Sequence, residues 1–230
     1  MSEKLYSFSD MSVRRAPLLS TVRRILSCLK RQGPGYVFTP GDLLRFGSRA
    51  AVDKTLSRLA QTGRIRRLDR GLYDVPKVSV RLGMLAPTPD RIAAALGRQT
   101  GSVVQPTSAR AANAVGLSTQ VPARAVYLTN GTSRRRVVGS QTIELRRAAP
   151  RQLLGAGSTA GAVIQALRYL GQRGVTKATA QRLAATLSTS DKRALAGLAP
   201  AAPAWMRTVI AQVAGPSPST TGGRWTKSRG

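Results

Sequence analysis

The sequence predicts an α+β protein, in which N-terminal helices and a basic hairpin precede a mixed α/β region with a helical, bundle-like end. Three observations predict this class. Apolar residues recur at helical spacing before residue 62, short apolar runs between residues 125 and 145 have strand composition, and the chain beyond residue 150 is rich in Ala and Leu. A chain of 230 residues is long enough for two domains that each bury a core.

We expect four segments along the chain. Residues 1–18 are expected to form a flexible arm that is closed by Pro17, and residues 19–78 a helical domain that ends in a hairpin. A connection rich in Pro, Gly and basic residues then leads to a mixed domain at 84–214. The tail, 215–230, has too little apolar content to order itself.

The helical domain is predicted to contain three helices. The first is expected from Ser20, a good N-cap, to Arg31, and the glycines and proline at 33–35 stop it. Thr39 caps a short second helix that starts at a proline. That helix ends at Gly47, which we expect to take a positive φ and to turn the chain sharply.

The third helix is expected over residues 48–61, where Ser48 is the cap. Its apolar residues fall on one face, while polar and mostly basic residues fall on the other. Gly63 ends this helix, and Gly71 suits the bend of a short hairpin that carries four arginines. Helix, tight turn, helix and hairpin in this order predict a winged helix-turn-helix, which is a DNA-binding motif.

The third helix and the hairpin supply the candidate DNA-binding residues. A recognition helix needs short polar groups that meet base edges and longer cations that hold phosphates. Arg49 or Arg58 is a candidate for a bidentate contact with guanine, the alternative being phosphate contact or solvation. The hairpin arginines are candidates for phosphate or minor-groove contacts. The predicted set is Thr39, Ser48, Arg49, Lys54, Ser57, Arg58, Arg64, Arg66, Arg67 and Arg70.

The charge also points to nucleic acid. Thirty-seven Lys and Arg against nine Asp and Glu give a net charge of +28, which repels itself in a compact protein unless a polyanion lies nearby. A GC-rich genome explains Arg in place of Lys, but it does not explain the scarcity of Asp and Glu. A second phosphate-facing surface is possible in the later domain, with scattered solvated arginines as the alternative; its candidates are Arg134, Arg135, Arg136, Arg146 and Arg147.

Other chemistry is poorly represented. With no histidine and a single cysteine, Cys28, a His or Cys metal site, a disulfide framework and a histidine-based catalytic triad are excluded within one chain. The glycines between 155 and 161 match no phosphate-loop spacing and are interpreted as the start of a helix at Ser158. We therefore expect no enzyme, no cofactor and no metal. Without a signal segment or an apolar span, a cytoplasmic protein is expected.

The later domain is predicted to hold a small sheet beside several helices. Strands are expected at 125–129, 137–138 and 142–145, joined by turns at Asn130-Gly131 and Gly139-Ser140. Helical composition marks the remaining elements, namely 90–96, 108–115, 158–171, 177–187, 190–196 and 203–213.

The run FTPGDLLRFGSRAAVDKTLSRLAQTGRIRRLDRGLYDVP resembles the N-terminal winged-helix domain of AbiEi-type antitoxins, which belong to type IV abortive-infection (phage-defence) toxin–antitoxin systems. The resemblance implies an autorepressor that binds inverted repeats in its own promoter, with two copies pairing on double-stranded DNA. It also implies that residues 48–61 enter the major groove and that 64–75 form the wing. An antitoxin determinant after residue 80 would then counteract a nucleotidyltransferase-like toxin.

Two alternative functions also fit the sequence. One is an interaction protein whose basic second domain binds and neutralises a toxin directly, with the winged helix as a scaffold. The other is an RNA-binding module, although aromatic residues make up only 4% of the chain, too few for an extensive base-stacking platform.

Overall fold

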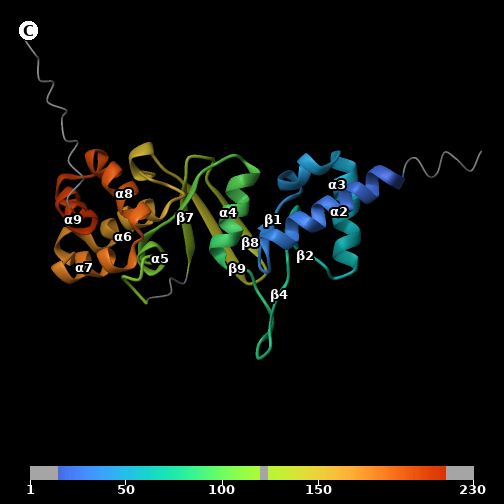
Figure 1. Cartoon of the computed structure of the whole chain (residues 1–230), viewed down its shortest axis with the longest axis horizontal. Coiled ribbons are helices and arrows are strands. Elements are labelled where there is room, and N and C mark those ends of the chain that lie inside the picture. Colours follow the sequence, from blue (N-terminus) through green and yellow to red (C-terminus); the bar gives the residue numbers. More distant parts are fainter. Residues whose placement is uncertain (1–14, 120–123, 216–230) are drawn as a thin grey trace, which may run out of the picture. The chain divides into compact units, whose positions relative to one another are not determined.

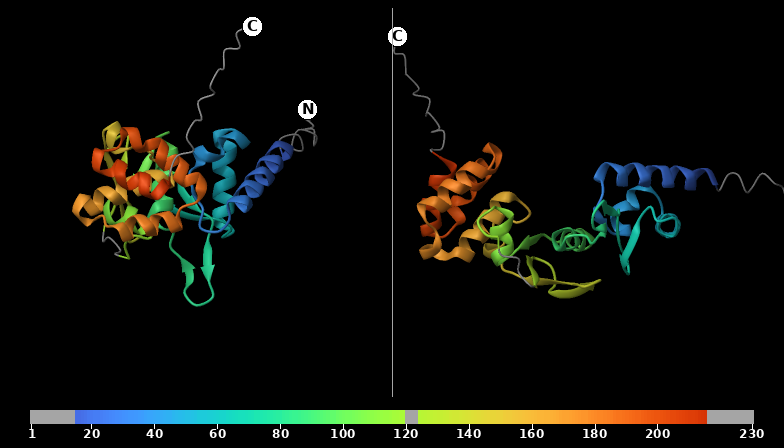
Figure 2. Two further views of the ribbon diagram at one scale, coloured as in Figure 1. Left: turned by 60° about the vertical axis from the view of Figure 1, so that its left-hand side comes forward. Right: turned by 90° about the horizontal axis from the view of Figure 1, so that it is seen from below.

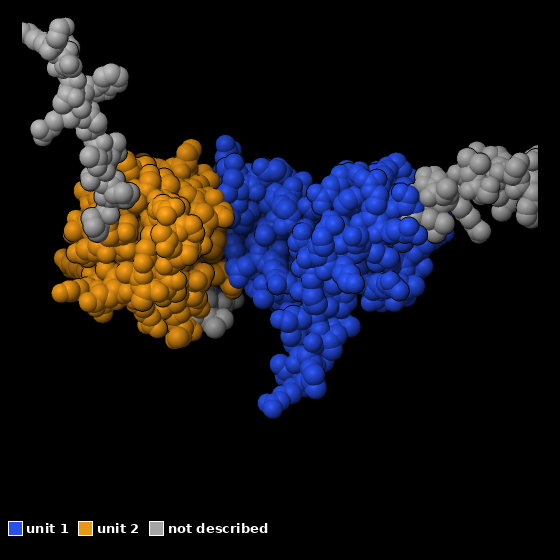
Figure 3. All heavy atoms as spheres, in the orientation of Figure 1, with its two compact units in different colours: residues 1–104, 124–147 blue, residues 105–123, 148–230 orange. Residues whose placement is uncertain are grey.

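The fold is α+β, as the sequence predicts. The computed structural model describes residues 15–119 and 124–215 (Figure 1). The chain divides into two compact units, coloured separately in Figure 3. Unit 1 contains residues up to 104 together with 124–147, and unit 2 contains 105–123 together with the chain from 148 onwards. Most of the expected arm and nearly all of the expected tail lie outside the described residues.

Unit 1 begins with the elements predicted for a winged helix-turn-helix and continues into a second sheet. Its elements are α2 (Arg15–Gln32), β1 (Val37–Phe38), η1 (Pro40–Phe46), α3 (Arg49–Gln61), β2 (Arg66–Asp69), β3 (Leu72–Asp74), β4 (Lys77–Ser79), β5 (Gly83–Leu85), α4 (Pro89–Gln99), β7 (Ala125–Thr129), β8 (Arg134–Val138) and β9 (Gln141–Arg147).

The first helix starts earlier than its sequence predicts. α2 is continuous from Arg15, so Ser20 lies inside it and is not its cap. Pro17 was expected to close the arm, but it lies in the first turn of this helix. A proline is tolerated there because the first backbone N–H groups of a helix have no partner within the helix, so its missing N–H costs little.

The turn between the second and third helices also differs from expectation. The second helix, η1, is a 3₁₀ helix, and Gly47 after it is extended, with φ 170°, so the predicted positive φ is wrong. Glycine leaves room for α2 here, because a Cβ on Gly47 would lie only 3.0 Å from the Thr21 hydroxyl of that helix. That hydroxyl donates to the carbonyl of Phe46 at 3.1 Å, which ties the turn to α2.

The hairpin of the predicted wing belongs to a three-stranded sheet with strand order β1-β3-β2. Both faces of this sheet are covered. Tyr73 and Val75 pack on the core of α2, η1 and α3, while Leu68 and Leu72 pack on a second core that includes Ile92 of α4. The domain boundary expected between residues 78 and 84 therefore does not coincide with the boundary between the compact units.

The segment after Pro76, expected to be a connection, is a second hairpin. β4 and β5 pair only with each other among the described strands, and in Figures 1 and 2 they extend away from the rest of unit 1. The missed signal was the alternation of apolar residues at 78, 80, 82 and 84. Gly83, with φ +66°, closes the loop between the two strands.

The second sheet of unit 1 contains the three predicted strands. β9 lies between β7, to which it is parallel, and β8, to which it is antiparallel. Gly139-Ser140 is therefore the turn of a hairpin, whereas Asn130-Gly131 joins strands that are not neighbours. α4 covers one face of the sheet, where Tyr127 is buried and donates from its hydroxyl to Asp90 at 2.7 Å.

Unit 2 is helical, as the sequence predicts for the end of the chain. Its core gathers small and branched apolar residues of α5, α6, α7, α8 and α9. Ser158 caps α6, and glycines 155 and 161 lie so close that a Cβ on Gly161 would meet the carbonyl of Gly155. The elements are α5 (Ser108–Ala114), η2 (Pro150–Gln152), α6 (Thr159–Gly174), α7 (Lys177–Thr186), α8 (Thr189–Leu198), η3 (Ala199–Ala201) and α9 (Ala204–Ala214), and β6 (Val104–Pro106) spans the boundary of the units.

Candidate nucleic-acid interface

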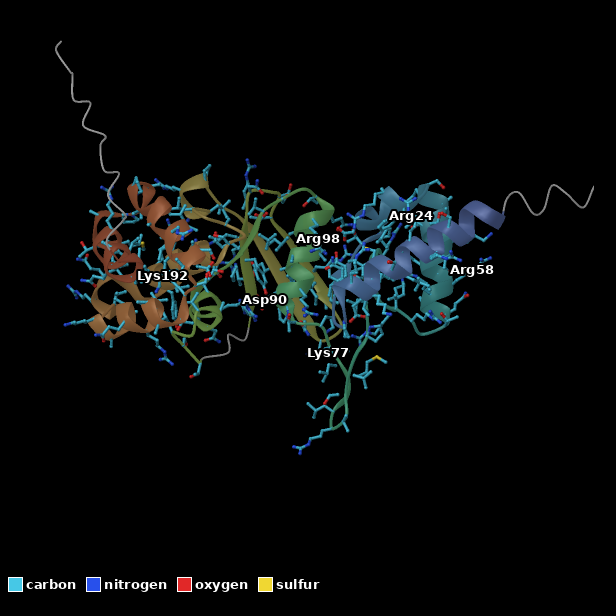
Figure 4. All side chains as sticks on the ribbon, viewed as in Figure 1. Arg24, Arg58, Lys77, Asp90, Arg98 and Lys192 are labelled. Atoms are coloured by element: carbon cyan, nitrogen blue, oxygen red, sulfur yellow. The ribbon has the colours of Figure 1, made fainter. Side chains whose placement is uncertain are left out.

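The outward face of α3 is free of packing contacts. Val52, Leu56 and Leu59 are buried against α2 and η1, which fixes the opposite side of the helix toward solvent. Figure 4 shows Arg58 pointing away from the body of unit 1. The exposed residues of the helix are Arg49, Ala50, Asp53, Lys54, Ser57, Arg58 and Gln61. The predicted recognition face is therefore accessible along the whole helix.

One acid interrupts this basic face. Arg49 donates from Nε to Asp53 at 2.7 Å, one helical turn further on, and both side chains are largely exposed. An exposed pair of this kind contributes little to stability. It does hold Arg49 along the helix surface, so that Asp53 competes with any phosphate or base for this guanidinium. Among the ion pairs of the described residues, none involves Lys54 or Arg58.

Two arginines beside the turn were missed by the sequence prediction. Arg24 of α2 and Arg45 of η1 both lie over the ring of Phe46, at 5.3 and 4.8 Å from its centroid. Arg24 also donates to the carbonyl of Arg45 at 3.4 Å. Both side chains are exposed, and the Gly47-Ser48 turn into α3 follows directly. No local pattern marks this cluster, because Arg24 and Arg45 belong to different helices.

The start of the second helix is less available than predicted. Thr39 is buried, and its hydroxyl donates to Asp42 at 3.2 Å. Asp42 also accepts the Thr39 backbone N–H at 2.8 Å, which completes the predicted capping interaction. Its other oxygen accepts from Arg98 Nε at 3.1 Å. Thr39 therefore stabilises the fold and does not face a ligand.

The wing arginines divide into two groups. Arg66 forms a bidentate pair with the buried Asp74, at 3.0 and 2.6 Å, and also donates to the carbonyl of Leu85 at 2.9 Å. It is therefore a structural residue, contrary to the prediction. The other three wing arginines are exposed, namely Arg64, Arg67 and Arg70. They remain candidates for contact with a polyanion.

The tip of the wing is hydrogen-bonded to strand β8 of the second sheet. Arg136 of β8 donates from Nε to Asp69 at 2.7 Å and from Nη2 to the carbonyl of Arg70 at 2.8 Å. The Asp69 carboxylate also accepts the Arg70 backbone N–H, and this bond, followed by that from Arg136, lowers the pKa of Asp69. The wing is thus held in one position, while the Arg70 side chain is exposed.

The predicted second basic surface is not one continuous surface. Residues 134 and 136 lie on the α4 side of β8, opposite Leu145 and Ile143 of β9, whereas Arg135 lies on the other face opposite Glu144. Arg134 donates to the carbonyl of Leu96, and burial lowers its pKa. Arg146 pairs with Glu144 at 2.7 Å. Only Arg135 and Arg147 of the five have exposed guanidinium groups that no described ion pair occupies.

The carboxylates in the described part of unit 1 are all engaged. Residues 15–104 and 124–147 contain 23 Lys and Arg but only six Asp and Glu. Five of the six pair with an arginine, and Asp90 accepts from Tyr127. Most of the positive charge in these residues therefore has no internal counter-charge.

Metal-binding and membrane-spanning features are absent from the described residues. Within 15–119 and 124–215, no three His, Cys, Asp or Glu side chains come together as a metal site would require. None of the helices in these ranges combines the length and the apolar character that are needed to cross a bilayer.

Comparison with known proteins places the chain in a family. The model of a family described as "Family of unknown function (DUF6088)" matches residues 24–195. The chain belongs to this family. The matched range includes α3, the wing, the β4–β5 hairpin and the second sheet.

A solved structure is similar to this DUF6088 protein at low identity. It is the "Crystal structure of RV2827C protein from Mycobacterium tuberculosis", which is 16% identical and aligns over 84% of this chain and 81% of its own, with a TM-score of 0.39. No curated protein matches the chain.

Proposed function

We propose that this protein binds duplex DNA through a winged helix-turn-helix formed by residues 19–78, with α3 in the major groove. The observation that carries the proposal is the exposed basic face of α3, on which Lys54 and Arg58 take part in no described ion pair, while every described carboxylate of unit 1 is engaged. A polyanion satisfies this excess charge, and a helix with one exposed polar face fits the major groove of B-DNA.

The residues take distinct roles in this proposal. Lys54 and Arg58 contact phosphates or base edges from the middle of α3. Arg24 and Arg45, stacked on Phe46, reach the phosphates that flank the N-terminus of the helix, where backbone N–H groups also attract anions. These assignments follow the separation of phosphate contacts, which position the protein, from base contacts, which specify the sequence.

The biological setting follows from the resemblance of residues 38–76 to AbiEi-type antitoxins. In this proposal the protein acts in the cytoplasm as an autorepressor, and two copies bind inverted repeats upstream of its own gene. It also counteracts a nucleotidyltransferase-like toxin encoded next to it. The test is co-expression with the neighbouring gene: rescue of growth supports antitoxin activity, and unchanged toxicity rejects it.

DNA binding is tested by a mobility-shift titration with DNA from upstream of the gene. The variant Lys54→Ala/Arg58→Ala should bind at least about tenfold more weakly, since two phosphate or base contacts are lost. The control is Lys192→Ala/Arg193→Ala in α8, which removes the same charge from unit 2. Equal affinity of the α3 variant and the wild type would refute the assignment.

A second candidate function is direct binding of an acidic toxin by unit 2. The observation in its favour is that residues 105–123 and 148–214 carry nine Lys and Arg against a single acid, Asp191. A groove in this unit, lined in part by Trp205 of α9 and Lys177 of α7, adds an apolar surface. Purification of a stoichiometric complex that no longer binds DNA would favour this candidate.

A further inference from the structure

The β4–β5 hairpin exposes an unusual amount of apolar surface. The exposed fraction is 70% for Val78, 58% for Met84 and 77% for Leu82, and Val80 is fully exposed. Val78 and Met84 are cross-strand partners and so share one face, while Val80 and Leu82 lie in the loop at the tip. The space-filling view shows the hairpin standing clear of the rest of unit 1 (Figure 3).

Such a hairpin needs a partner. Two paired strands are at best marginally stable in water on their own, and an exposed apolar patch on this scale marks an interaction site. The root of the hairpin is nevertheless well anchored. Arg66 donates to the carbonyl of Leu85 while it pairs with the buried Asp74 of the wing, and Gln141 donates to the carbonyl of Pro87. The base of the hairpin is thus held in a defined position beside the wing, and its tip projects from there.

The charge of the hairpin favours DNA as the partner. Between Val75 and Pro89 there are two cations, Lys77 and Arg81, and no acid. Both cations are exposed, one at the root and one in the loop. An apolar tip flanked by cations has the composition of the wedges that enter the minor groove and part adjacent base pairs.

A second copy of the chain fits less well. Complete burial of the four apolar side chains removes only about 400 Å² from each copy, roughly half of what a stable interface buries on each partner. Two chains that each carry +28 also repel each other. DNA relieves this repulsion, whereas a second copy increases it.

The length of the hairpin suits a groove. Arg81 lies four positions after Lys77, and at the rise of a β-strand four positions span at most about 13 Å. The minor groove of B-DNA is about 7.5 Å deep. A hairpin of this length reaches the base-pair edges with its tip where bending has widened the groove, which is about 6 Å wide in straight B-DNA.

We propose that the β4–β5 hairpin is an arm that enters the minor groove of the bound DNA, where Val80 and Leu82 wedge into a base step and Lys77 and Arg81 contact phosphates. This inference rests on the proposed DNA-binding function. The arm bends the duplex, and it selects sites with an easily unstacked pyrimidine–purine step at the point of insertion.

The test compares Val80→Ser/Leu82→Ser with the wild type on end-labelled duplexes from upstream of the gene. Energy transfer between the ends reports bending, and 2-aminopurine placed along the duplex reports unstacking. The wild type should raise both signals. The variant should bind about fivefold more weakly and leave both signals at their free-DNA values, since all the altered side chains face solvent and the fold is unaffected.

The salt dependence of DNA binding distinguishes the contribution of the apolar hairpin tip from that of the basic residues of α3. The hairpin variant should keep the wild-type salt dependence of binding, because it removes no charge, whereas Lys54→Ala/Arg58→Ala should reduce that dependence. The matched control is Val137→Ser, which alters an exposed valine of β8 outside the hairpin and should change neither signal.

Each contrary result has a defined meaning. If the wild type binds DNA and depends on Lys54 and Arg58, but the hairpin variant bends and unstacks DNA like the wild type, the arm is rejected and the proposed function stands. If the wild type binds no DNA, both fail. If sedimentation shows a dimer without DNA that the hairpin variant dissociates, the arm is a contact between copies and the minor-groove assignment is overturned.

Discussion

Asp69 and Arg136 lie 67 positions apart in the chain, yet Arg136 Nε donates to the Asp69 carboxylate at 2.7 Å. The same guanidinium donates to the carbonyl of Arg70, so the bend of the wing is held from β8. Both side chains are about one-third exposed, and solvent therefore screens the attraction between them. The main effect of the pair is to fix the position of the wing.

Arg136→Ala and Asp69→Asn are expected to be coupled. Each single change should lower the free energy of unfolding by about 0.5–1 kcal/mol, and the double variant should be less destabilised than the sum of the two. The measurement is urea unfolding of all four proteins. Strict additivity would mean that the contact contributes nothing in solution.

The pair between Arg66 and Asp74 should matter far more for stability. The Asp74 side chain is only 1% exposed, so Arg66→Ala leaves a buried carboxylate without a counter-charge, which costs about 3 kcal/mol or more. Arg67→Ala, on the neighbouring exposed arginine, should stay within about 0.5 kcal/mol of the wild type. Chemical denaturation measures both. Similar stability of the two variants would contradict the structural role given to Arg66.

Asp53→Asn should strengthen DNA binding. The change removes the one acid on the exposed face of α3 and frees Arg49, whose Nε now donates to Asp53. The expected gain is about threefold to tenfold in affinity, or ~0.6–1.4 kcal/mol. Asp191→Asn in α8 is the control, since it changes the net charge by the same amount. A loss of affinity, or an equal gain for both variants, would argue against contact between this face and DNA.

Lowering the pH should weaken the interactions of the Asp69 carboxylate that fix the position of the wing. The pKa of Asp69 lies below its ordinary value of 3.8, first because the Arg70 N–H donates to the carboxylate and then because of Arg136. The folded state therefore binds this proton less tightly than the unfolded chain. The stabilisation is fully present above the unfolded pKa and disappears as the pH falls through the lower folded pKa.

Unfolding measured from about pH 6 down to pH 2.5 should therefore show a shallower loss of stability for Asp69→Asn than for the wild type. Other carboxylates with lowered pKa, among them Glu144 and Asp191, keep some acid dependence in both proteins. Identical slopes for the two proteins would show that Asp69 titrates alike in the folded and unfolded chains.

Binding to DNA should depend steeply on salt. If about six phosphates are neutralised, the logarithm of the affinity falls with the logarithm of salt concentration at a slope of about −5. Lys54→Ala/Arg58→Ala should reduce the steepness by up to about 2. Fluorescence anisotropy over a salt series gives both slopes. A slope near zero for the wild type would exclude the electrostatic mechanism.

The sequence by itself determined the α+β class, the positions of most helices and the outward face of α3. These features depend on residues close together in the chain, since a helix buries positions three and four apart and its caps lie within one turn. Val52, Leu56 and Leu59 therefore indicated their common face in advance, and Ser48 and Ser158 indicated the starts of their helices.

Only the tertiary structure decided which basic side chains are exposed and which are bound to a carboxylate of the same chain. Arg66 and Arg136 look no different in sequence from Arg67 and Arg135, yet the first two are bound to Asp74 and Asp69 and the others are exposed. The same holds for the glycine at 47, where the nearby Thr21 of α2 sets the requirement. Contacts between residues distant in the chain arise from how elements pack on shared cores, and no local pattern encodes them.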